Sequence, residues 1–232
     1  MEKIFVIKIG GSVLSLKDNL FNFQEALRIK EFFTSIDSSI KFVLITGGGY
    51  ISREYQQMLK DNNYPEYDQH YIGTIACNLN AVMLRSVFGE LAEDKILGLS
   101  DVNSNSPITF SKRFLIAGAG QPGPSSDWDA TWLAKRLGTT NIVTLKDIDG
   151  VYSEDPDKNP NSTRLPNVSW EEYLKIIDNP DKHTPGANLP VDPIAARLAK
   201  ENKITFYVVS GTDFENLKNL LTGNEYIGTR IN

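Results

Sequence analysis

Cysteine, histidine and long apolar runs are scarce in this sequence of 232 residues. Its single cysteine, Cys77, excludes a disulfide within the chain and a cysteine-based metal cluster, so we expect a small buried hydrophobe there. No apolar run approaches the roughly 20 residues that span a bilayer. The first residues lack the basic start, long apolar core and cleavage site of a signal peptide. These absences predict a soluble, cytoplasmic protein that does not enter a membrane.

Positive charge is also in short supply. The sequence holds 24 lysines and arginines against 29 aspartates and glutamates, a formal net charge of −5. A general nucleic-acid-binding protein needs a basic surface, so this balance argues against one. The charge balance does not argue against a nucleotide-binding site, because such a site needs only a few local hydrogen-bond donors and cations.

Short apolar runs alternate with longer amphipathic stretches along the chain. The predicted strands are residues 4–9, 42–45, 114–116, 142–145 and 204–209. The predicted helices are about residues 24–33, 51–62, 73–87, 130–137, 170–177, 193–201 and 214–222. Apolar strands separated by helices predict a central, mostly parallel sheet in a three-layer α/β/α sandwich. Since no linker or repeat divides the sequence, we expect a single domain over residues 1–232.

A first glycine-rich turn follows the first strand, in the segment Lys8-Ile9-Gly10-Gly11-Ser12. Glycines at such a place let backbone N–H groups come close to a phosphate. Lys8 lies inside an otherwise apolar strand, which is unusual for a solvated surface lysine. We therefore expect its charge to act on a phosphate, although a structural turn is the simpler alternative.

A second turn, Thr46–Gly49, joins a strand to a helix that carries Arg53. Three successive glycines at the start of a helix form an unobstructed site for an anion. Arg53 is expected to clamp a phosphate through two hydrogen bonds. The alternative is that Arg53 is a surface residue near Glu54.

A third turn spans residues 118–127 and holds glycines, two hydroxyls and the carboxylate of Asp127. Ser125, Ser126 or Asp127 can cap the following helix, contact a substrate, or do both. After the strand at 142–145, Asp147 can orient the active lysine or help to hold magnesium. Tyr152 and Asp155 are placed to contact adenine and ribose, unless this is only an aspartate-rich turn.

Together these segments resemble the amino acid kinase superfamily, in the same order and over nearly the whole chain. Lys8–Ser12 is similar to its opening KxGGS motif, and Thr46–Gly49 with Arg53 to the TGGGxxxR pattern of uridylate kinases. The stretch from Asp149 to Pro160 is similar to their DGVYxxDPxxxP signature. Features of the archaeal form are matched by Pro185-Gly186, Val191–Ala195 and Ile227–Thr229.

The resemblance implies phosphorylation of UMP by ATP with Mg²⁺, giving UDP and ADP in pyrimidine nucleotide biosynthesis. It also implies a homohexamer built from dimers, with the acceptor mainly in the N-terminal half and ATP in the C-terminal half. The residues implied at ATP and its phosphates are Lys8, Ile9, Gly10, Gly11, Ser12, Gly49, Arg53, Lys146, Tyr152 and Asp155. Those implied at the acceptor are Gly48, Gly120, Gln121, Pro122, Gly123, Pro124, Ser125 and Ser126. Lys8, Arg53 and Asp147 are the predicted catalytic residues, and magnesium is expected to be held mainly by ATP.

The sequence departs from the family pattern on the acceptor side. Uridylate kinases usually carry an aspartate three residues before the position of Gly73. Here that residue is His70, with Asp68 two residues earlier, and either is expected in the acceptor pocket unless His70 is an exposed loop residue. Lys146 replaces a more usual threonine, and Trp128 and Asp129 replace small residues.

Because of these departures, the resemblance does not fix the identity of the acceptor. One alternative is a kinase of the same fold for another small phosphate or carboxylate. A second is a nucleotide-binding storage or regulatory protein without turnover. The presence of both Lys8 and Arg53 argues against the second alternative.

Overall fold

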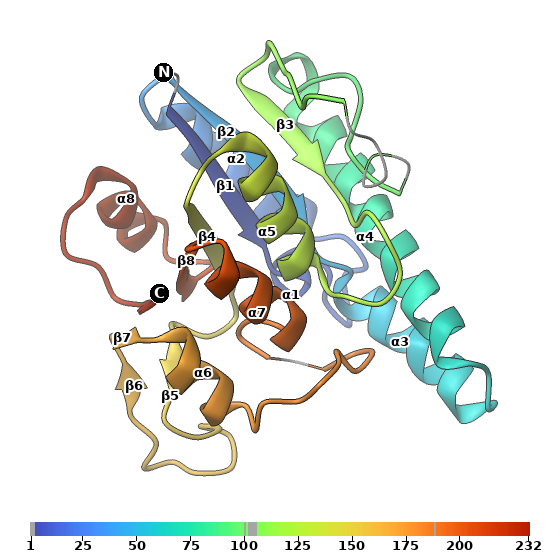
Figure 1. Ribbon diagram of the computed structural model, residues 1–232. Coiled ribbons are helices and arrows are strands. Elements are labelled where there is room, and N and C mark those ends of the chain that lie inside the picture. Colours follow the sequence, from blue (N-terminus) through green and yellow to red (C-terminus); the bar gives the residue numbers. More distant parts are fainter. Residues whose placement is uncertain (1–2, 100, 102–105, 188) are drawn as a thin grey trace.

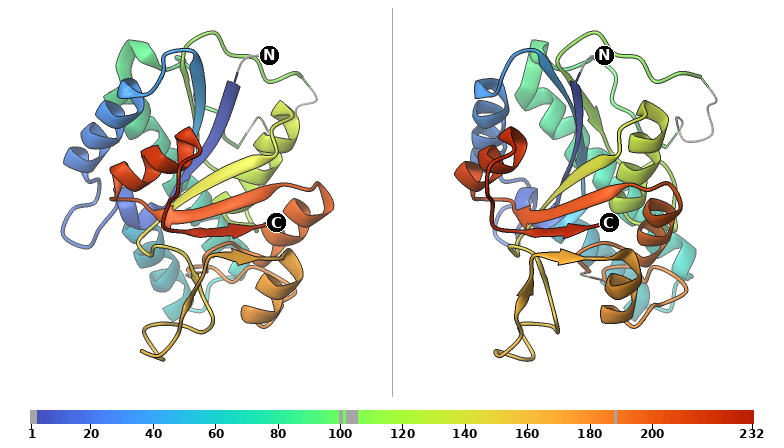
Figure 2. Two further views of the ribbon diagram at one scale, coloured as in Figure 1. Left: turned by 90° about the vertical axis from the view of Figure 1, so that its left-hand side faces the viewer. Right: turned by 60° about the vertical axis from the view of Figure 1, so that its left-hand side comes forward.

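The computed structural model describes residues 3–99, 101, 106–187 and 189–232. Its main sheet has seven strands in the order β3-β2-β1-β4-β8-β9-β7 (Figure 1). These strands are β1 (Lys3–Ile9), β2 (Ile40–Thr46), β3 (Phe114–Ala117), β4 (Asn141–Lys146), β7 (Asn167–Val168), β8 (Thr205–Ser210) and β9 (Thr229–Ile231). The first five in the order run parallel, and β9 is antiparallel to β8. A separate hairpin, β5 (Val151–Tyr152) with β6 (Arg164–Leu165), projects from the body of the molecule (Figure 2).

Helices cover both faces of the main sheet. One face is packed by α1 (Gly11–Leu14), α2 (Phe23–Ser35), α4 (Glu66–Phe88) and α8 (Phe214–Thr222). The other is packed by α5 (Ser126–Leu137), α6 (Trp170–Ile176) and α7 (Pro193–Glu201). The helix α3 (Gly49–Asp61) packs on α4, and a short 3₁₀ helix, Gly89–Leu91, follows α4.

Alternation along the central strand explains the two layers. Val6 of β1 belongs to one core, whereas Ile7 and Ile9 belong to the other. Successive side chains of a strand point to opposite faces, so an apolar strand of this kind is stable only when both faces are covered. The predicted three-layer sandwich with a mostly parallel sheet is confirmed.

The start of α4 differs from the sequence prediction. The helix begins at Glu66 instead of near residue 73, so the alternative that His70 is an exposed loop residue is wrong. Pro65 stands immediately before the helix, and the acidic residues Glu66 and Asp68 lie in its first turn, where negative charge is favourable. Because these residues carry little apolar periodicity, the start of α4 was not evident from the pattern.

By length and composition alone, the helical segment Glu66–Leu91 could cross a membrane, which the sequence analysis did not anticipate. Half of its most apolar window is buried inside the fold. Ala81, Leu84 and Phe88 pack into the core of the sheet. The apolar character of α4 is therefore accounted for in part by its role as a core helix.

Candidate functional site

The glycine turns that follow β1 and β2 meet at the carboxyl edge of the sheet. The N–H of Gly47 donates to the carbonyl of Ile9 at 3.0 Å, and the N–H of Gly10 donates to the carbonyl of Leu145 at 2.8 Å. Next to these turns lies a pocket with about 890 Å³ of open space. Its border includes Lys8, Gly10–Ser12, Gly47–Gly49, Arg53, Pro124–Asp127 and Lys146.

Two of these glycines are required by close contact between the turns. A Cβ atom on Gly11 would lie 2.1 Å from the backbone nitrogen of Gly49, which no side chain can tolerate. Gly49 also has a φ of +67°, in the left-handed region that favours glycine. It is the first residue of α3, and the N–H groups of Tyr50 and Ile51 in the first turn already donate to Ser15. The positive end of the helix still borders the pocket. This arrangement favours an anion.

Two lysines and one aspartate form a buried cluster on one wall of the pocket. The Nζ of Lys8 lies 3.1 Å from Oδ1 of Asp127, and the Nζ of Lys146 lies 3.9 Å from its Oδ2. All three residues are nearly inaccessible to solvent. Burial would raise the pKa of Asp127, but the positive charges of Lys146 and Lys8 outweigh it and hold that pKa below its ordinary value. Asp127 is therefore an ionised counter-charge for both lysines.

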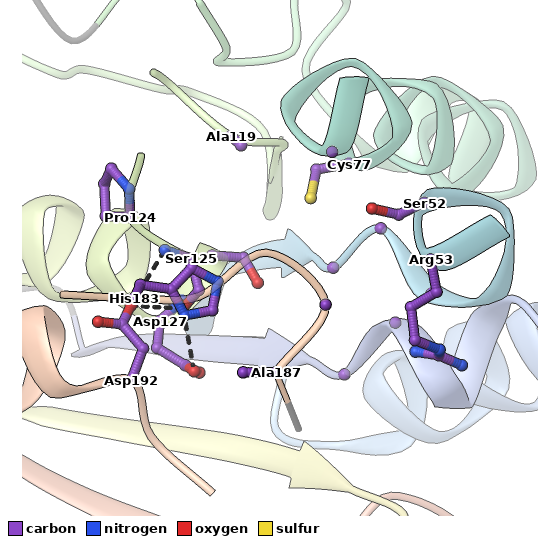
Figure 3. Close-up of a pocket in the computed structure, with 18 of the residues that line it drawn as sticks. Ser52, Arg53, Cys77, Ala119, Pro124, Ser125, Asp127, His183, Ala187 and Asp192 are labelled. Carbon is purple, nitrogen blue, oxygen red and sulfur yellow. Dashed lines mark hydrogen bonds between the residues drawn. The ribbon is translucent and has the colours of Figure 1, made fainter. Parts of the chain in front are cut away.

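Arg53 lies on the opposite side of the pocket from Asp127 (Figure 3). Its side chain is exposed, and among the residues that the structure describes it has no hydrogen-bond or ion-pair partner. An arginine of this kind can offer two parallel N–H groups to a phosphate without first breaking a bond inside the protein.

Helix α4 supplies a third wall. His70, Gly73, Thr74 and Cys77 border the pocket, at the spacing of one helix face. Asp68 does not border it, because two residues before His70 the helix presents a different face. Of the two candidates for the acceptor side, the structure therefore brings only His70 to the pocket. Cys77 is buried as expected, and burial raises the pKa of its thiol to about 12, so it stays protonated.

The segment between α6 and α7 reaches across to this wall. His183 borders the pocket with its ring centroid 5.9 Å from that of His70. The Nζ of Lys182 pairs with Glu66 of α4 at 2.7 Å. Burial lowers the pKa of His183, and its Nδ1 is buried without a hydrogen-bond partner in the part of the chain that the structure describes. A neutral imidazole with a spare ring nitrogen is thus available to a ligand.

The third turn is only partly at the pocket. Pro124, Ser125 and Ser126 border it, whereas Gly120, Gln121, Pro122 and Gly123 do not. Ser125 caps α5, its Oγ accepting from the N–H of Asp127 at 3.1 Å. The same hydroxyl donates to Asp192, whose other oxygen caps α7. Hydrogen bonds of Ser125 therefore tie the end of this turn to the C-terminal half.

Four further predicted residues lie outside the pocket. The side chain of Ile9 is buried in the core between the sheet and one layer of helices, outside the pocket. Asp147 follows the last residue of β4 and is exposed, away from the pocket border. The hydroxyl of Tyr152 donates to Asp149 at 2.8 Å, and Asp155 pairs with Lys158 at 2.9 Å. These local bonds hold both side chains in the region of the projecting hairpin.

The sequence did not lead us to predict the roles of two pocket residues. Asp127 was considered only as a helix cap or a general substrate contact, although it pairs with both buried lysines. A carboxylate soon after a glycine turn was an available signal. His183 was not singled out, although Pro185-Gly186, two residues later, had been noted as a feature of the archaeal form.

Asp129 is a buried acid beside the pocket loop. Its Oδ1 accepts from the N–H of Gly120 at 2.8 Å, and its Oδ2 has no hydrogen-bond partner among the described residues. Burial raises its pKa from the ordinary 3.8 to about 8. Between those two values the unfolded chain carries the charge and the folded chain keeps the proton. The carboxyl group therefore makes folding progressively less favourable as pH rises from about 4 to 8.

We expect Asp129→Asn to stabilise the protein, because the amide keeps the acceptor for Gly120 and never ionises. The gain should be small near pH 4 and reach at least about 1 kcal/mol, or roughly 2–4 °C in Tm, at pH 8. Calorimetric melting of both proteins between pH 5 and 9 measures it. A difference in Tm that does not grow with pH would contradict the assignment.

Comparison with known proteins bears on this arrangement. Residues 3–210 match the amino acid kinase family. The chain is 30% identical to a uridylate kinase of Thermococcus kodakarensis, over 97% of this chain and 98% of that protein. It is 29% identical, with the same coverage, to a uridylate kinase of Pyrobaculum neutrophilum. The crystal structure of uridylate kinase from Archaeoglobus fulgidus is similar with a TM-score of 0.78 and 27% identity, over 99% of this chain and 100% of that one.

Proposed function

The chain belongs to the amino acid kinase family, and on this basis we propose that it is a uridylate kinase. It transfers the γ-phosphoryl group of ATP to UMP, giving UDP and ADP for the supply of pyrimidine nucleotides. The observation that carries the proposal is the pair of cations on opposite walls of one pocket. Lys8 lies buried beside the glycine turns, and Arg53 is exposed without a partner among the described residues.

Phosphoryl transfer needs two anionic reactants held in line and the charge of the moving group neutralised. In the proposed reaction, an oxygen of the UMP phosphate forms a bond to the γ-phosphorus as the bond to the bridging β–γ oxygen breaks. Lys8 and the glycine N–H groups that are not bonded between the turns stabilise the transferred group, and Arg53 holds the acceptor phosphate. The acceptor is already ionised at neutral pH, so the reaction needs no general base.

Magnesium is proposed to arrive with ATP. Within the part of the chain that the structure describes, no group of three or more His, Cys, Asp or Glu side chains could hold a metal ion. Asp127 is already paired with two lysines. These residues fit an ion that is held mainly by nucleotide phosphates and water, as is usual for Mg²⁺ in kinases. When bound, the ion would neutralise negative charge on the phosphate oxygens.

We also propose a single domain in which the two halves hold different substrates. His70, Thr74 and the turn at Ser125 suit the acceptor nucleoside, since they line the same pocket as Arg53. Adenosine would then lie toward the end of β4 and the hairpin that carries Tyr152 and Asp155.

An exposed apolar face on α4 supports a homo-oligomer. Tyr71, Ile75, Leu79 and Val82 are all more than a third exposed and follow one another at helical spacing. A contiguous apolar surface of this kind is typical of a protein–protein interface. We propose that two copies pair through this face within a hexamer in the cytoplasm, which light scattering in solution can test.

The direct test is an assay of the purified protein with ATP, Mg²⁺ and a panel of acceptors. We expect UDP and ADP in equal amounts with UMP. Product from another small phosphate or carboxylate, with none from UMP, would favour the alternative kinase. ATP binding without a phosphorylated product from any acceptor would favour a storage or regulatory protein.

His70→Asp tests how UMP is held. The substitution restores the carboxylate that uridylate kinases usually have at this position, so kcat/KM for UMP should stay within about threefold of wild type or rise. Asp68→Asn is the matched control, since Asp68 does not border the pocket. A large loss with UMP in His70→Asp, with the control unchanged, would instead point to a different natural acceptor.

A further inference from the structure

We infer that Lys146 is a second catalytic lysine, which contacts the transferred phosphoryl group together with Lys8, and that Asp127 positions both ammonium groups. The inference rests on the proposed phosphoryl transfer. The resemblance places Lys146 only near ATP, whereas here its target is the transferred phosphoryl group and its partner is Asp127. Other members of the family more often have threonine at this position, so this role of Lys146 does not follow from the resemblance.

Strand register brings the two lysines to the same face of the sheet. Lys8 of β1 is paired with Thr144 of the neighbouring parallel strand β4. Lys146 is two residues further along β4, so its side chain points to the same face as that of Thr144. Both ammonium groups then meet Asp127 near the start of α5, at 3.1 and 3.9 Å.

The buried charges do not balance. Two ammonium groups face one carboxylate, and Lys8, Lys146 and Asp127 are 4%, 8% and 3% exposed. Burying an uncompensated charge is costly unless a partner is present. A phosphate in the adjacent pocket would supply the missing negative charge.

Other acids near the cluster do not supply it. Asp192 is also buried, but it forms no ion pair with Lys8 or Lys146; its oxygens accept from Ser125 and cap α7. Asp129 is protonated at neutral pH, since burial raises its pKa to about 8. Asp147 follows Lys146 in the chain but is exposed to solvent.

Lys146 keeps donors for a ligand. Its Nζ donates to the carbonyl of Leu189 at 3.0 Å, and the 3.9 Å to Asp127 is an ion pair longer than a hydrogen bond. An ammonium group has three N–H donors. Lys146 borders the pocket, so at least one of them is available there.

Burial also lowers the pKa of Lys146 to about 8, despite the opposing charge of Asp127, and the charge of Lys8 lowers it further. The exposed carboxylate of Asp147 also opposes this shift, and burial lowers the pKa of the neighbouring His183. In the free protein Lys146 is charged below pH 8 and loses its proton as pH rises through 8. A bound phosphate would favour the charged form and draw a proton onto it.

A purely structural role is the competing explanation, because the bond to Leu189 anchors the segment before α7. Lys146→Met keeps the length of the side chain and removes both charge and donors. If the lysine acts on phosphate, we expect kcat to fall by about 30- to 100-fold. The KM for UMP should change little, and Tm at pH 7 should rise because a buried charge is gone. Lys175→Met, at an exposed lysine of α6, is the control and should behave as wild type.

The pH dependence separates the two explanations. Wild-type kcat/KM should fall above about pH 8, and Lys146→Met should lack this alkaline decrease. Lys146→Arg, which keeps the charge, should recover part of kcat and retain activity to higher pH. A lower Tm with unchanged kcat and an unchanged alkaline decrease would overturn the inference in favour of a structural role.

A binding measurement makes the test independent of UMP. Calorimetric titration of ATP at pH 8, in two buffers of different ionisation enthalpy, reports protons taken up on binding. We expect wild type to take up more protons than Lys146→Met. Equal uptake would overturn the inference, even if UMP is phosphorylated normally. If wild type took up more protons than Lys146→Met but did not phosphorylate UMP, the result would support the role of Lys146 and reject UMP as the acceptor.

Discussion

Lys8→Ala is expected to lower kcat by about 100-fold or more, which is typical when a preorganised electrostatic contact is removed. The KM values for ATP and UMP should change much less. The reason is that the ammonium group matters most when negative charge shifts between donor and acceptor oxygens in the transition state. Steady-state kinetics with each substrate varied in turn measures both effects.

The fold should survive this substitution. Asp127 would still be paired with Lys146, so no isolated buried carboxylate is left behind. Circular dichroism and Tm would confirm that the loss is catalytic, and Lys218→Ala, at an exposed lysine of α8, controls for the change in net charge. A kcat close to wild type would remove Lys8 from the mechanism.

Much of the pocket's border could be predicted because its signals are local. Lys8 stands out in an apolar strand, and a run of glycines after a strand marks a turn wherever the chain folds. Both turns lie at the carboxyl edge of the sheet because parallel strands end there together. The position of Arg53 followed from its place on the first turns of α3.

The rest of the site depends on contacts between distant segments. Asp127 meets Lys8 only because α5 packs beside β1, and no spacing in the sequence reveals that pair. The choice of His70 over Asp68 depends on which face of α4 points inward, and therefore on a helix start that the pattern left open. His183 reaches the pocket through a long connection without regular structure.

The net charge of the whole chain was a poor guide to the charge of the pocket. The chain is acidic overall, with a formal charge of −5, but the acids nearest the glycine turns are already engaged. Asp127 neutralises only part of the charge of two lysines, and Asp192 caps a helix. With Arg53 added, the pocket has an excess of positive charge within an acidic protein. Such a local excess favours small anionic substrates over a large polyanion.

Arg53→Ala is expected to lower kcat/KM for UMP by about 100-fold, the loss typical when two charge-assisted hydrogen bonds are removed together. Most of the effect should appear in the KM for UMP, since the guanidinium is proposed to hold the acceptor phosphate before and during transfer. The stability of the fold should be unchanged, because Arg53 is exposed and bonds to no described residue of the protein.

Two further variants decide what the arginine contributes. Arg53→Lys keeps the charge but lacks the planar pair of N–H donors, so it should recover only part of the lost affinity. Lys60→Ala removes an exposed positive charge from the last turn of the same helix, away from the pocket, and should leave kcat/KM close to wild type. If Arg53→Lys were fully active, long-range charge alone would account for the effect. If Arg53→Ala left both kcat/KM and the KM for UMP unchanged, the acceptor phosphate would have to lie elsewhere than at the second glycine turn.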